Sequence, residues 1–84
     1  MVYFALTRQG YEDLIAELGC APRNLWVNHD VLSADEIKQL RESGVYISNF
    51  TKLVDPSDPA DVAQAVETVS EHHPGSTVWV EQVL

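Results

Sequence analysis

LWVNHDVLSADEI, residues 25–37, joins an apolar run to a helix start, and this junction decides how the whole chain is interpreted. Ser33 followed three residues later by Glu36 is a capping box, in which side chains satisfy the free backbone N–H groups of a first helical turn. Glycine is a frequent helix stop, and Gly44 is the next one along the chain. The stretch therefore predicts a strand over residues 25–32 and a helix that Gly44 ends.

The same strand-then-helix pattern precedes this stretch. Residues 2–6, VYFAL, are apolar without a break, as in a strand that is buried on both faces. Thr7 is a suitable N-cap, and Gly19 a suitable C-terminal stop, for the helix that follows. The apolar residues of that helix recur at the spacing of one helical face and are Tyr11, Leu14, Ile15 and Leu18.

The pattern also continues after the quoted stretch. Residues 45–54 alternate less clearly and carry more polar side chains, which favours a strand at the edge of a sheet. Asp58 as N-cap and Pro59 at the first helical position open a third helix. Its inner face consists of Val62, Ala65, Val66 and Val69. Residues 76–84, STVWVEQVL, then predict a fourth strand.

Strands and helices thus alternate in the order β-α-β-α-β-α-β. Helices between consecutive strands favour right-handed crossovers, and hence a four-stranded, mostly parallel sheet with helices on both faces. The most apolar strand, residues 2–6, belongs inside the sheet, which leaves the strand orders 3-2-1-4 and 2-1-3-4. We therefore expect a single small three-layer α/β domain over residues 1–84.

The composition argues against several classes of partner. The chain carries 13 acidic residues against 5 Lys and Arg, for a net charge of −8. Such a surface repels phosphates and anionic lipids, so we expect no nucleic-acid partner and no membrane partner. Cys20 is the single cysteine, and residues 1–6 lack the features of a secretory leader. Both observations favour the cytoplasm.

Known cofactor and catalytic motifs are absent from the sequence. The loop after the first predicted strand reads TRQG, residues 7–10, and contains no phosphate-binding glycine pattern. The chain also has no CxxC pair and no GxSxG sequence. We therefore predict no cofactor and name no catalytic residue, and the sequence favours a function other than catalysis.

Polar residues do gather where the first two predicted strands end. Ligands of open parallel sheets bind beyond the carboxyl ends of the strands, and a helix N-terminus there attracts anions. The candidate ligand-binding residues at this edge are Thr7, Arg8, Gln9, Asn28, His29 and Asp30. The alternative is that they are solvated strand ends and caps. His29 and Asp30 would face opposite sides of an extended strand, so only a turn or bulge could pair them.

The other histidines do not extend this site into a metal site. His72 and His73 end the third predicted helix, which runs antiparallel to the strands and so ends at their amino edge. A strand of about six residues separates this edge from His29 by about 20 Å. A cluster of Cys20 with His72 and His73 would still lack a fourth ligand. We therefore predict no metal site.

These observations favour a small cytoplasmic module that acts through protein–protein contacts, either as a homo-oligomer, for which we expect a homodimer, or as an accessory subunit of a protein partner. Both possible strand orders place the fourth strand at an edge, where its unpaired backbone groups invite a partner. The candidate interface residues are Val78, Trp79, Val80 and Val83. The alternative is a domain that binds a small ligand or a nucleotide-like ligand, or a minor enzyme, with its site at the carboxyl edge of the sheet near Arg8 and His29.

Overall fold

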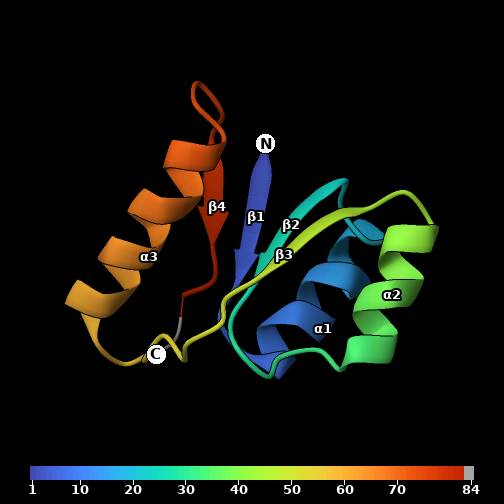
Figure 1. Ribbon diagram of the computed structural model, residues 1–84, viewed down its shortest axis with the longest axis horizontal. Coiled ribbons are helices and arrows are strands. Elements are labelled where there is room, and N and C mark those ends of the chain that lie inside the picture. Colours follow the sequence, from blue (N-terminus) through green and yellow to red (C-terminus); the bar gives the residue numbers. More distant parts are fainter. Residues whose placement is uncertain (83–84) are drawn as a thin grey trace.

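The computed structural model describes residues 1–82 and shows the alternation of strands and helices that the sequence predicts (Figure 1). The elements are β1 Val2–Ala5, α1 Arg8–Leu18, β2 Asn24–Val27, α2 Ala34–Glu42, β3 Tyr46–Asn49, α3 Pro59–His72 and β4 Val78–Val80. Within these 82 residues, no helix has the length and apolarity that crossing a membrane requires.

The four strands form one parallel sheet in the order β3-β2-β1-β4. This order decides between the two that the sequence allowed. The register aligns Tyr3 with both Leu25 and Trp79. β1 is therefore an interior strand, and the two edges of the sheet are formed by β3 and β4.

The predicted caps explain where the helices begin and end. The Thr7 hydroxyl accepts the backbone N–H of Gly10, and Gly19 closes α1 in the left-handed conformation at φ 80°. Ser33 and Glu36 form the complete capping box at the start of α2. The Asp58 carboxylate accepts a backbone N–H in the first turn of α3. Each side chain satisfies a donor that the helix itself leaves free.

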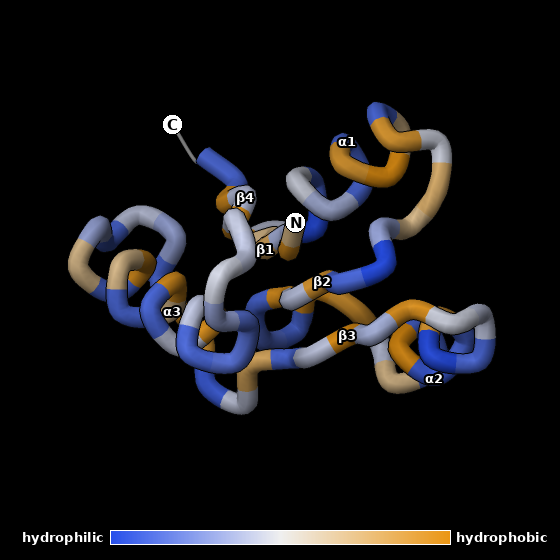
Figure 2. The backbone as a smooth tube through the Cα atoms, turned by 90° about the horizontal axis from the view of Figure 1, so that it is seen from above, coloured by the Kyte–Doolittle hydropathy of each residue, from blue (hydrophilic) through white to orange (hydrophobic). Residues whose placement is uncertain are grey.

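The helices cover both faces of the sheet, with α1 and α2 on one face and α3 on the other (Figures 1 and 2). Alternate strand residues therefore enter two separate cores. Ala5, Leu25 and Ile47 pack with residues of α1 and α2. Val2 and Phe4 pack with residues of α3. Burying both faces is what produces the uninterrupted apolar sequence of β1.

The strands are shorter than the sequence predicts, and this is the main correction to the expected fold. The second strand, predicted over residues 25–32, ends at Val27 and is followed by a turn. The third, predicted over residues 45–54, ends at Asn49. The predicted apolar face of α1 is also too long, because Leu18, its last residue, is 40% exposed.

Candidate functional site

The carboxyl edge of the sheet contains the position where ligands of open α/β sheets bind. α1 leaves β1 on one face of the sheet, whereas α3 reaches β4 across the other face. The direction of winding therefore reverses between the neighbouring strands β1 and β4. Ligands bind in the crevice beyond the carboxyl ends of two such strands. Any small-molecule site in this fold is expected first at this crevice.

The crevice holds a carboxylate of the chain itself. Glu81 directly follows β4, and its backbone N–H donates to the Phe4 carbonyl at 3.1 Å. Its Oε1 atom accepts the backbone N–H groups of Leu6 at 2.8 Å and Thr7 at 2.9 Å. Its Oε2 atom accepts the hydroxyl of Thr7. The N-terminus of α1, which the sequence offered as an anion site, is thus occupied by Glu81.

Gly10 makes room for this carboxylate. Gly10 is buried in the first turn of α1. A Cβ atom on Gly10 would overlap the carboxyl group of Glu81. The glycine is therefore needed for the close approach of a side chain, and not for an unusual backbone conformation.

Two surface hollows lie beside Glu81, which lines both. One of about 530 Å³ lies between α3 and the end of β4, and Val62, Val66 and Val80 give it a largely apolar wall. The other, of about 350 Å³, lies between α1 and β4 and is lined in part by Asp13 and Trp79. Because the Glu81 oxygens already accept hydrogen bonds, the carboxylate acts as a clamp between β4 and the β1–α1 turn.

Arg8 is engaged in a bridge between α1 and α2. Its guanidinium lies 2.8 Å from the Glu36 carboxylate and 3.4 Å from that of Glu12. It also donates to the Val31 carbonyl at 3.3 Å. Hydrogen bonds from the Ser33 backbone and then from Arg8 lower the pKa of Glu36. Arg8 therefore points toward α2 and pairs with a carboxylate in the first turn of that helix.

Two further candidates also make side-chain hydrogen bonds within the chain. Gln9 donates to Asp13 at 2.8 Å on the exposed face of α1. Asn28 is 1% exposed, and its amide nitrogen donates to the carbonyls of Leu6 and Val54. The amide oxygen of Asn28 accepts the backbone N–H groups of His29 and Val54. Asn28 thereby ties the ends of β1 and β2 to the segment that follows β3.

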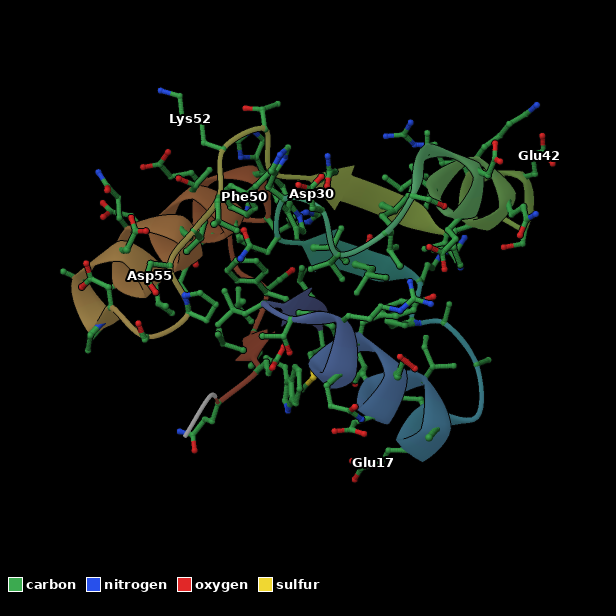
Figure 3. All side chains as sticks on the ribbon, turned by 90° about the horizontal axis from the view of Figure 1, so that it is seen from below. Glu17, Asp30, Glu42, Phe50, Lys52 and Asp55 are labelled. Atoms are coloured by element: carbon green, nitrogen blue, oxygen red, sulfur yellow. The ribbon has the colours of Figure 1, made fainter. Side chains whose placement is uncertain are left out.

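His29 and Asp30 do come together, because a turn follows β2. Asp30 adopts the left-handed conformation at φ 62°, and its carboxylate lies 3.3 Å from Nε2 of His29. The Asp30 side chain is 85% exposed, and Nδ1 of His29 is buried without a partner among the described residues. The side chain of His29 is itself 40% exposed, and Asp30 is labelled in Figure 3. The pair therefore sits on an open surface.

The histidines at the opposite edge pack against a tryptophan. The indole N–H of Trp26 donates to Nε2 of His73 at 3.0 Å. The ring of His72 lies 5.3 Å from that of Trp26, and its Nδ1 atom lies 2.9 Å from the Thr68 carbonyl. Across residues 1–82, no three His, Cys, Asp or Glu side chains are grouped as metal ligands would be. These contacts fasten the end of α3 to β2.

The residue that sequence reasoning missed is Glu81. Glu81 is the one charged residue of the predicted fourth strand, residues 76–84, and no sequence motif marks it as a contact of the first helix. A glycine in the first turn of a helix, Gly10, was the available signal that something approaches the helix closely there. Among the predicted interface residues, Val78 and Val80 are half-buried against α3, and Trp79 is 37% exposed. Val83 lies outside the described residues.

No protein-family model, no curated protein and no solved structure matches the chain.

Proposed function

We propose that this chain acts through protein–protein contacts and associates with further copies of itself through the edges of its sheet. The observation that supports the proposal is that both edge strands of the sheet, β3 and β4, have one side without a neighbouring strand among the described residues. Each edge also carries an exposed aromatic side chain, Tyr46 at 65% and Trp79 at 37%. Open edges of this kind recruit additional strands.

The residues of β4 itself provide little of the protection that is usual at an edge. Thr77 and Glu81 direct backbone groups to β1, in hydrogen bonds with Val2 and Phe4. Because backbone groups alternate along a strand, Val78 and Val80 present theirs on the outer side. β4 itself contains no lysine and no proline, the residues that commonly block an edge.

The alternative function, binding of a small ligand at the carboxyl edge, has less support. Its best position is the crevice between β1 and β4, where the Glu81 carboxylate already accepts the N–H groups of Leu6 and Thr7. Arg8 is paired with Glu36. A ligand would have to displace contacts that the chain makes with itself.

Sedimentation equilibrium at about 100 µM tests the proposal, because this concentration is far above a micromolar dissociation constant. We expect a mass well above the 9.4 kDa of one chain. Val80→Pro should restore the monomer, because the N–H that it removes faces away from β1. Val80→Thr, which keeps that N–H, is the matched control, and circular dichroism checks that both variants fold. A wild-type protein that sediments as the monomer would contradict self-association.

A further inference from the structure

We infer that the copies associate head to tail, with the β4 edge of one copy against the β3 edge of the next and Trp79 in a hollow beside α2. This inference rests on the proposed self-association and names the surfaces that make it. It follows from a difference between the two edges of the sheet, in backbone groups, in shape and in charge.

The outer side of β3 presents free backbone groups. Tyr46 and Phe50 donate their N–H groups to carbonyls of the β2 segment, at 2.8 Å and 3.0 Å. By alternation, Ile47 and Asn49 face outward. Arg41 of α2 confirms this direction, because its guanidinium donates to the Ile47 carbonyl at 3.3 Å. A strand added here would find N–H groups without a partner among residues 1–82 and one carbonyl, that of Ile47, which the Arg41 side chain covers.

A hollow of about 590 Å³ runs beside this edge, between α2 and β3. Its lining combines an apolar floor with basic side chains and consists of Ala34, Ile37, Lys38, Arg41, Glu42 and Asn49. Two of the 5 basic residues of the chain are therefore in this wall. The carboxylate of Glu42 in the same lining offsets part of this positive charge, because it lies 4.0 Å from Nζ of Lys38.

The β4 edge has the complementary character. Trp79 lies on the face of the sheet that α1 covers, with its ring 5.7 Å from that of Tyr3. The hollow between α1 and β4 is lined by Trp79 together with the acidic side chains of Asp13 and Glu17. A partly exposed aromatic ring beside acidic side chains thus lies at one end of the sheet, and a hollow with apolar and basic side chains lies at the other.

The arrangement of the helices brings these features together in only one kind of assembly. α1 lies toward the β4 end and α2 toward the β3 end of the same face of the sheet (Figure 2). A second copy that continues the sheet with parallel strands keeps this face in common. Its Lys38 and Arg41 then approach Asp13 and Glu17 of the first copy, and its hollow receives Trp79.

The two-fold arrangements lack this complementarity. Antiparallel pairing of β4 with a second β4 would set α1 beside α1, and the acids of Asp13 and Glu17 against their own copies. Pairing of two β3 edges would oppose Lys38 and Arg41 in the same way. Like charges in close contact disfavour an interface, so the charges select the head-to-tail arrangement. Such a heterologous contact repeats, and closes only if the rotation between copies forms a ring.

Two edge-blocking variants test this inference by sedimentation equilibrium. Val80→Pro blocks the β4 edge and leaves β3 intact, whereas Asn49→Pro removes an outward N–H of β3 and leaves β4 intact. Each variant alone should be a monomer. An equimolar mixture should form a complex of two chains and nothing larger, because one intact edge of each kind remains available. Asn49→Thr and Val80→Thr are the controls, and both should assemble as the wild type does.

Charge variants give a second, independent measurement. Glu17→Lys should weaken association about fivefold, the upper end for an exposed ion pair, and Glu42→Gln should strengthen it. Glu67→Lys makes the same charge change on α3 and should have no effect. The wild type could instead form a dimer that Val80→Pro dissociates but Asn49→Pro does not. That result would overturn the head-to-tail inference, but self-association would still hold. A mixture of the two proline variants that stays monomeric would also overturn the head-to-tail inference. A monomeric wild-type protein would overturn both proposals.

Discussion

The carboxylate of Glu81 accepts the backbone N–H of Thr7 at 2.9 Å and also its hydroxyl, across 74 positions of the sequence. Thr7 is at the same time the N-cap of α1, where its hydroxyl oxygen accepts the N–H of Gly10. One contact therefore joins the end of the last described strand to the beginning of the first helix. The clamp fixes an edge strand of three residues, Val78–Val80, which has little pairing of its own.

Glu81→Gln should lower the free energy of unfolding by about 1.5–3 kcal/mol, the usual contribution of hydrogen bonds to a charged group. The amide keeps one oxygen acceptor, but its nitrogen cannot accept the Thr7 hydroxyl. Urea unfolding followed by circular dichroism measures the change. Gln82→Ala, at the exposed neighbouring position, should have almost no effect. Equal midpoints for Glu81→Gln and the wild type would show that the clamp does not stabilise the fold.

Gly10→Ala should have opposite effects in two backgrounds. In the wild type the added methyl group displaces the Glu81 carboxyl, so stability should fall. In a Glu81→Ala background the space is free, and alanine should stabilise the helix by about 0.5–1 kcal/mol over glycine. A double-mutant cycle measures the difference. If Gly10→Ala has the same effect in both backgrounds, Gly10 does not serve to accommodate Glu81.

Asn28→Ala should be among the most damaging single substitutions, costing about 3 kcal/mol or more. It leaves backbone groups of Leu6, His29 and Val54 without partners in a buried position, and each such group costs about 1–3 kcal/mol. Asn28→Asp has the same shape but would bury a carboxylate against two carbonyl oxygens. Its defect relative to the wild type should therefore shrink as the pH falls and the carboxylate is protonated. A pH-independent defect would contradict the assigned donor and acceptor roles.

Sequence reasoning succeeded where the controlling interactions are local. The N-caps of Thr7, Ser33 and Asp58 act within three residues, and each is present as predicted. The parallel sheet follows from the alternation of strands and helices. The strand order β3-β2-β1-β4 could not be predicted from the sequence, because two strand orders bury β1 equally well.

The candidate site could be predicted only in part, because long-range contacts decide what its residues do. Asn28 ends β2 through bonds to Leu6 and Val54, which lie 22 and 26 positions away. The contact between Glu81 and Thr7 could not be predicted for the same reason, because 74 positions of the sequence separate the two residues. His29 and Asp30 pair because Asp30 takes a positive φ, a conformation that the sequence pattern of a strand does not indicate.

The interaction of Glu36 with Ser33 and Arg8 gives a prediction about pH. The pKa of Glu36 is lowered from 4.5, first by the hydrogen bond from the Ser33 backbone and then by Arg8. A carboxyl group whose pKa is lower in the folded state stabilises the fold above its unfolded pKa. That contribution is lost as the pH falls through the folded value. Glu36→Gln keeps an acceptor for the capping box and removes only the charge.

The wild type should therefore be more stable than Glu36→Gln at neutral pH, by an amount that stays constant well above the ordinary pKa of 4.5. The difference should decrease as the pH falls below this value, and vanish once Glu36 is protonated in both states. Urea unfolding of both proteins between neutral pH and about pH 3 measures it, since that span crosses the titration of ordinary carboxyl groups. Glu67→Gln, a matched change at an exposed position of α3, should show no such pH-dependent difference. A Glu36→Gln defect that persists undiminished at the acidic end would mean that shape, and not charge, is what Glu36 contributes.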